Sequence, residues 1–109
     1  MNEIDNLIKE LVKFRDERDW QKFHDPKDLA IAISLEASEL LENFLWKSSK
    51  EASLEKVKEE LADIFCYALL IAESYNLDVK NIISDKIKKN HQKYPIEKAK
   101  GSNKKYNQL

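Results

Sequence analysis

Apolar residues recur along this chain with the period of an α-helix. In the first segment these positions are Ile4, Leu7, Ile8 and Leu11. Spacings of three and four residues line one face of a helix. We therefore predict a first helix over residues 3–18, followed by a loop over residues 19–25.

Two longer helices are predicted next. Asp25 followed by Pro26 is typical of a helix start, because Asp caps free N–H groups and Pro fits the first turn. The second helix is expected from Pro26 to about Lys47. After a short turn over residues 48–50, the third helix is expected over residues 51–75.

A fourth helix closes the pattern. Asp78 is its predicted N-cap, and Tyr94 before Pro95 is expected to end it. Its apolar stripe is Val79, Ile82, Ile83 and Ile87. Beyond residue 95 the sequence predicts an irregular basic tail.

The composition favours an all-α fold. One Gly and two Pro in 109 residues leave few residues suited to the tight turns of a β-rich protein. The length fits one domain over residues 1–109, and we expect a four-helix bundle. Cys66 is the only cysteine and is predicted to be a buried reduced thiol.

Charge and hydropathy limit the partners. From Lys86 to the end there are eight lysines against one glutamate, so the acidic excess lies in residues 1–85. A basic tail suits an anionic ligand or solvent, whereas the acidic remainder argues against a nucleic-acid polymer. No apolar run approaches the ~20 residues of a membrane span, and no signal peptide is evident. We expect a cytoplasmic protein with no membrane partner.

Four acids interrupt the two apolar central helices. Helices that are apolar on nearly all sides are expected to be buried, which predicts a homo-oligomer because one short chain covers them poorly. Burying carboxylates is costly unless they are paired or bind a metal. The four acids are Glu36, Glu39, Glu60 and Asp63.

The spacing of these acids predicts that they converge. Each pair is three residues apart, which puts its members roughly 60° apart on a helix. In an antiparallel hairpin centred between residues 49 and 50, Glu36 is level with Asp63, and Glu39 is level with Glu60. Four converging carboxylates repel, and oxygen ligands favour Mg²⁺ or Mn²⁺.

Two other interpretations of the acids stay open. Glutamates three residues apart on a helix often face solvent or pair with lysines. A di-iron bundle uses Glu-x-x-His motifs, but neither His24 nor His91 follows a glutamate by three residues.

Magnesium bound by carboxylates usually serves a phosphate substrate. Lysines in the last third of the chain offer complementary positive charge. Aromatic side chains are available to stack on a base, although they are also suited to filling a core. They are Trp20, Phe23, His24 and Trp46.

Together these residues carry a family resemblance. E-A-S-E at Glu36–Glu39 and E-E-L-A-D at Glu59–Asp63 resemble the E-x-x-E…E-x-x-D pattern of the all-α nucleoside triphosphate pyrophosphohydrolases. This superfamily includes MazG-like proteins and dimeric dUTPases, and the dCTP pyrophosphatase branch is the most similar. Further similar segments are Phe14–Leu29, Phe44–Lys47, Lys86–Pro95 and Gly101–Tyr106.

The resemblance implies a role for each matching residue. The four acids would be the Mg²⁺ ligands and the catalytic groups. Trp20, His24 and Trp46 would line the base pocket. Tyr67, Lys86 and Asn90 would contact sugar or phosphate. A neighbouring subunit would close the site with Lys93, Tyr94, Lys105 and Tyr106.

The resemblance also implies an activity and an assembly. The chain would convert a nucleoside triphosphate to the monophosphate and pyrophosphate. The preferred substrate would be dCTP or a modified dCTP, and the reaction would serve nucleotide pool clean-up. It would work as a homodimer or homotetramer. The alternatives are a broad-specificity MazG-like or phosphoribosyl-ATP-type pyrophosphohydrolase and, outside the enzymes, an oligomeric helical scaffold.

Overall fold

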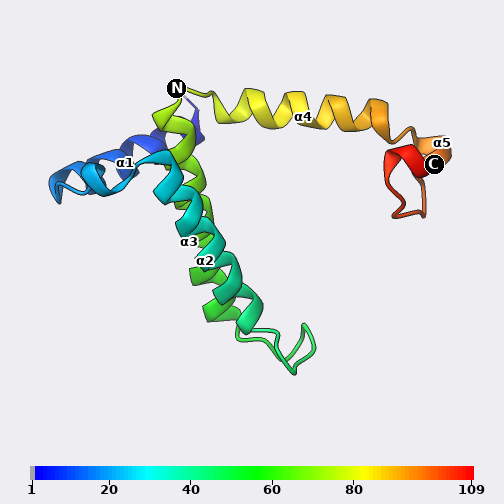
Figure 1. Ribbon diagram of the computed structural model, residues 1–109, viewed down its shortest axis with the longest axis horizontal. Helices are drawn as coiled ribbons and strands as arrows, with labels where there is room; N and C mark the ends of the chain where they lie inside the picture. Colours follow the sequence, from blue (N-terminus) through cyan, green and yellow to red (C-terminus); the bar gives the residue numbers. More distant parts are fainter. Residues whose placement is uncertain (1) are drawn as a thin grey trace. The chain divides into compact units, whose positions relative to one another are not determined.

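The structure is a computed structural model that describes residues 2–109, and every regular element in that range is helical (Figure 1). This confirms the all-α prediction. None of the described helices combines the length and apolar character needed to cross a bilayer. The elements are α1 (Glu3–Glu17), η1 (Gln21–Phe23), α2 (Pro26–Glu42), α3 (Leu54–Ser74), α4 (Val79–Lys93), α5 (Ile96–Ala99) and η2 (Tyr106–Gln108).

The chain forms two compact units. The N-terminal unit runs up to Leu77 and contains α1 to α3, and the C-terminal unit is Asp78–Leu109. All four predicted metal ligands belong to the N-terminal unit. A single functional domain over residues 1–109, and its assembly into a bundle, stay predictions.

An antiparallel hairpin of α2 and α3 is the frame of the N-terminal unit, and α1 lies against α3 (Figure 1). The hairpin starts as predicted, because the Asp25 carboxylate accepts a hydrogen bond from the Lys27 N–H (3.2 Å). Its core side chains are Leu29, Leu70 and Ala72, which are 2%, 3% and 5% exposed. These residues come from the first turn of α2 and the last turns of α3.

The loop of the hairpin is longer than the sequence predicted. We expected a turn over residues 48–50, but α2 already ends at Glu42 and α3 begins only at Leu54. Trp46 has a left-handed φ of 62°, which no helix continues through. The true N-cap of α3 is Ser53, whose side chain accepts from the Lys56 N–H (3.4 Å).

The C-terminal unit agrees with the sequence over α4 and departs from it in the tail. Asp78 caps α4 by accepting from the Asn81 N–H (3.1 Å), and the helix ends at Lys93, before Pro95, as predicted. The tail contains the short helices α5 and η2, where we expected irregular chain. The Tyr94 and Tyr106 rings meet edge to face at 6.3 Å, so the tail folds back on the end of α4.

Candidate active site

Three carboxylates of the α2–α3 hairpin converge on one point. Glu36 of α2 and Glu60 and Asp63 of α3 each offer an oxygen, and the three oxygens lie within 4.8 Å of one another. Glu36 and Glu60 are half-buried, whereas Asp63 is exposed. We call these three residues the acidic cluster. Their spacing suits a shared cation held by oxygen ligands.

The longer loop explains which acids meet. With a loop over residues 43–53 the hairpin is centred on Ser48, and Glu36 and Glu60 lie equally far from that centre along the chain. Glu36 therefore faces Glu60 and not Asp63 alone. Glu39 lies outside the cluster, in a polar hollow of about 470 Å³ that Glu60 also lines.

The acidic cluster fits a hard divalent cation. When Glu36 and Glu60 are both ionised, the buried Oε2 atom of each has no hydrogen-bond donor among residues 2–109, and a buried oxygen without a donor is costly. The neighbouring Glu60 carboxyl, burial and then Glu39 raise the pKa of Glu36 from 4.5 to about 7. Mg²⁺ or Mn²⁺ would relieve both costs.

The raised pKa of Glu36 predicts a pH-dependent response to magnesium. Folded Glu36 keeps its proton up to about pH 7, whereas the unfolded chain loses it near pH 4.5. The metal-free protein therefore loses stability as the pH rises through that window. We expect Mg²⁺ to raise the melting temperature by several degrees at pH 8 and by much less at pH 5.5, measured by circular dichroism.

Magnesium-free buffer with the same ionic strength from NaCl is the control for this prediction, since salt alone also screens the repulsion. An equal magnesium-induced shift at both pH values would contradict the assignment of Glu36 as a ligand.

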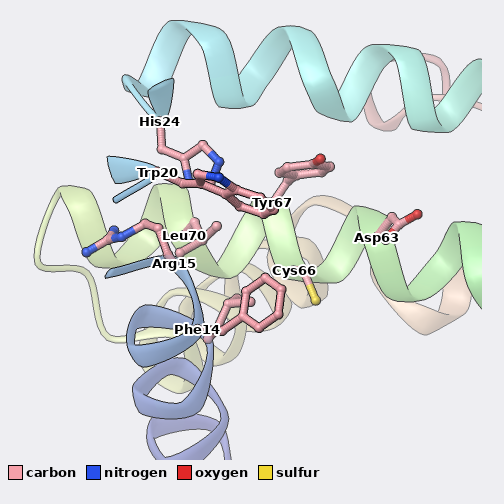
Figure 2. A pocket seen from close by; sticks show the side chains of 9 residues that line it. Phe14, Arg15, Trp20, His24, Asp63, Cys66, Tyr67 and Leu70 are labelled. Atoms are coloured by element: carbon pink, nitrogen blue, oxygen red, sulfur yellow. The ribbon is translucent and has the colours of Figure 1, made fainter. Parts of the chain in front are cut away.

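An aromatic cavity of about 380 Å³ adjoins the acidic cluster (Figure 2). Asp63 belongs to both, because it also lines the cavity. The remaining lining comes from α1, from the loop after α1 and from α3. It consists of Leu11, Phe14, Arg15, Trp20, His24, Cys66, Tyr67 and Leu70. We call this space the aromatic cavity.

Three rings provide the planar surfaces of the aromatic cavity. Figure 2 shows Trp20, His24 and Tyr67 gathered above α3. His24 and Tyr67 meet edge to face at 6.5 Å, and Trp20 meets Phe14 in the same way at 5.7 Å. The planar surfaces and the size of the space suit a stacked heterocyclic base.

His24 also offers a polar group. Its Nδ1 atom is buried without a hydrogen-bond partner among the described residues, which leaves it for a ligand. Burial, together with the positive charge of Arg15, lowers the pKa of His24. The imidazole is therefore neutral at pH 7, when one ring nitrogen donates and the other accepts.

The sequence did not single out five of the cavity residues as site residues: Leu11, Phe14, Arg15, Cys66 and Leu70. Phe14 and Arg15 end α1, inside the segment that resembles the dCTP pyrophosphatases, and that segment was the available signal. Cys66 is half-buried and not buried as predicted. Burial and the charge of Asp63 raise the pKa of its thiol, so it is not a reactive thiolate.

Two aromatic candidates lie outside the aromatic cavity. Trp46 stands in the 43–53 loop with its side chain fully exposed, at 101%. Phe23 is 62% exposed and does not line the cavity. A role for Trp46 in base binding stays a prediction.

The other predicted contacts belong to the C-terminal unit. Lys86 and Asn90 are exposed on α4, and Lys105 precedes η2. The Lys93 ammonium lies 5.0 Å from the centre of the Tyr106 ring, which gives the tail a cation–π contact. Tyr94 packs on the same ring. Lys93, Tyr94 and Tyr106 thus contact one another at the end of α4.

Comparisons with known proteins agree with this geometry. The sequence pattern of the MazG-like family matches residues 31–109. The chain is 34% identical over 106 residues to dCTP pyrophosphatase 1 of Rattus norvegicus and 32% identical to that of Homo sapiens, covering 90% of this chain and 62% of each relative. The chain thus spans less than two thirds of these curated relatives.

A solved structure is similar over a larger share of its own length. A pyrophosphatase from Archaeoglobus fulgidus superposes with a TM-score of 0.80 at 37% sequence identity. The match covers 87% of this chain and 94% of that protein.

Proposed function

This chain belongs to the MazG-like family, and from that premise we propose that it is a nucleoside triphosphate pyrophosphohydrolase. The observation that carries the proposal is the double position of Asp63. It belongs to the acidic cluster, which suits a phosphate-bound cation, and it lines the aromatic cavity, which suits a base. A nucleotide carries both a phosphate chain and a base in one molecule.

The acidic cluster would hold Mg²⁺, with Mn²⁺ as a substitute. A bound divalent cation neutralises phosphate charge and lowers the cost of charge developing on the reacting oxygens. The chain's own contribution is to hold Glu36, Glu60 and Asp63 on two helices, so that their geometry is fixed before the substrate arrives.

The reaction cleaves the bond to the oxygen that bridges the α- and β-phosphates. A water oxygen forms a bond to phosphorus, the bridging bond breaks, and the electron pair leaves with the departing phosphate group. The water proton passes to a base. Glu39 is the candidate for orienting or deprotonating this water, because it stands one turn from Glu36 on α2 and outside the acidic cluster. Glu36 is the alternative.

The aromatic cavity would receive the base, with Trp20 and Tyr67 as stacking surfaces and His24 as the polar contact. The names of the relatives point to cytosine, so we propose dCTP or a modified dCTP as the substrate. Removal of unwanted nucleotides from the cellular pool is the role that we propose for the reaction.

The other residue roles that the resemblance implies form part of the same proposal. Sugar or phosphate contacts are proposed for Tyr67, Lys86 and Asn90. Closure by a neighbouring subunit is proposed for Lys93, Tyr94, Lys105 and Tyr106. A homodimer or homotetramer is supported by the large apolar side chains that the hairpin exposes. Examples are Leu35 at 61%, Leu41 at 60% and Phe65 at 62% exposure.

A substrate panel tests the proposal. The pure protein is incubated with Mg²⁺ and each common NTP and dNTP, and with phosphoribosyl-ATP, and both products are quantified. We expect equal amounts of monophosphate and pyrophosphate, with the highest kcat/KM for dCTP. Equal turnover of all bases would favour the broad MazG-like alternative, and turnover of phosphoribosyl-ATP alone would favour that enzyme class.

Two further measurements, the position of an ¹⁸O label and the melting temperature with Mg²⁺, complete the substrate panel. Reaction in H₂¹⁸O labels the monophosphate after attack at the α-phosphorus and pyrophosphate after attack at the β-phosphorus. If no triphosphate is cleaved and Mg²⁺ leaves the melting temperature unchanged, the chain is a helical scaffold and the proposal is wrong.

A further inference from the structure

The C-terminal end of α1 is tied to α3 by a half-buried ion pair. Nη1 of Arg15 lies 3.3 Å from Oε2 of Glu73, and the side chains are 14% and 36% exposed. Nε of the same guanidinium donates to Oδ1 of Asp16 (2.9 Å). The contact between Arg15 and Glu73 joins residues that are 58 positions apart, so it is tertiary and not part of one helix.

The backbone of Arg15 holds the other side of the aromatic cavity. Its carbonyl oxygen accepts from the Arg18 N–H (3.2 Å) and from the Trp20 N–H (3.1 Å). Asp19 between them has a left-handed φ of 55°, which reverses the chain and directs Trp20 back toward α1. One residue thus binds α3 with its side chain and the Trp20 turn with its carbonyl.

The rest of α1 packs weakly. None of its side chains is fully buried, and Leu7 and Phe14 are 54% and 45% exposed. Apolar contacts therefore fix the distance between α1 and α3 less firmly than they fix the α2–α3 hairpin. Because Leu11, Phe14 and Arg15 form the α1 wall of the aromatic cavity, its width depends on what holds α1 in place.

We propose that Arg15 and Glu73 are positioning residues that set the width of the aromatic cavity and thereby the affinity for the base. This inference rests on the proposed function for its kinetic consequence, but its structural part does not. The ion pair lies at the Leu70 end of the cavity, away from Asp63. It therefore governs how the base is held and leaves the acidic cluster untouched.

Glu73→Gln is the sharpest test, because it keeps the size of the side chain and removes its charge. We expect KM for the preferred triphosphate to rise about tenfold, since small displacements of a binding wall are costly, while kcat stays within about twofold. Arg15→Lys keeps the charge but loses the planar fork, and we expect a smaller rise in KM.

Lys22→Gln is the matched control. It removes another ion pair of the same region, Lys22 to Asp19 at 3.1 Å, whose side chains are 61% and 74% exposed. Exposed pairs contribute little, so we expect unchanged KM and kcat. Circular dichroism at the assay temperature checks that each variant is folded, and Arg15→Lys replaces Glu73→Gln if the latter is not.

Trp20 fluorescence tests the structural part without any activity. In a Trp46→Phe background Trp20 is the only tryptophan, and acrylamide quenching reports how open the aromatic cavity is. We expect Glu73→Gln to raise the quenching constant and Lys22→Gln to leave it unchanged. Unaltered quenching and KM in folded Glu73→Gln, or a fall in kcat at constant KM, would overturn the inference.

The two proposals fail in different ways. If the parent protein cleaves no triphosphate, the proposed function is wrong, and the quenching comparison still decides whether the ion pair holds the cavity closed. If the parent is active but the variants match it in KM and quenching, only the inference about Arg15 and Glu73 is wrong.

Discussion

Replacing Glu36 with Gln is expected to lower the rate of pyrophosphate release by about 10³-fold, because the substitution removes charge from the centre of the acidic cluster. Glu36 is the α2 member of the cluster and faces both α3 members. Asp63→Asn is expected to have a loss of similar size. Initial rates of pyrophosphate release at saturating substrate and Mg²⁺ provide the measurement.

Stability separates this loss from unfolding. Since Glu36→Gln relieves repulsion in the acidic cluster, we expect the metal-free variant at pH 8 to melt about 4 °C higher than the parent, the shift for roughly 1 kcal/mol. Glu55→Gln is the matched control, because Glu55 is an exposed acid on the same helix as Glu60, 3.7 Å from Lys58. Turnover near the parent rate in Glu36→Gln would refute the assignment.

Replacing Trp20 with Ala is expected to raise KM for the preferred triphosphate about 30-fold. Stacking of a base on an aromatic side chain contributes ~1–3 kcal/mol, and a loss of about 2 kcal/mol corresponds to that factor. Trp20 lines the aromatic cavity and does not belong to the acidic cluster, so kcat should fall much less. Steady-state kinetics over a wide substrate range measure both parameters.

Phe23→Leu is the control for Trp20→Ala. Phe23 comes from the same loop and is aromatic, but it is 62% exposed and lies outside the aromatic cavity. We expect the KM of the Phe23→Leu variant to differ less than twofold from that of the parent protein. A similar rise in KM for both variants would mean that loop stability, and not stacking on Trp20, determines the affinity.

The sequence predicted the starts of α2 and α4 correctly but missed both ends of the loop that joins α2 and α3. Asp25 and Asp78 were recognised because a capping side chain is a local signal that needs no tertiary contact. The predicted end of α2, at about Lys47, was wrong because the apolar residues after Glu42 continue the helical pattern. From Asn43 onward the backbone instead makes turn hydrogen bonds to the third residue back, and the left-handed Trp46 lies beyond that point. No glycine marks this change in the sequence.

The same error in the loop changes which acids are expected to face each other across the hairpin. Helical spacing alone put Glu36 on one face with Glu39, and Glu60 on one face with Asp63, and this needed no loop length. Which acids meet across the hairpin depends on its centre, which the loop determines. A shift of that centre brings Glu36 to Glu60, while Glu39 stays near enough to Glu36 to raise its pKa.

Arg15 was missed for a different reason. An arginine near the end of an amphipathic helix is most often a solvated residue, and its partner Glu73 is 58 positions away. Only the tertiary structure brings these two residues together. Local patterns therefore predicted the chemistry of the acidic cluster but not the contact that holds the wall of the neighbouring cavity.

The acidic cluster is built from two helices that follow each other in the chain. Joining neighbouring segments costs little loop-closure entropy, and such local contacts form quickly during folding. Like charges therefore meet at an early stage, when closing the hairpin brings Glu36 against Glu60. The rate of that step will depend on the proton and divalent-cation concentrations of the medium. The ionic composition of the cell therefore affects how fast this protein folds as well as how stable it is once folded.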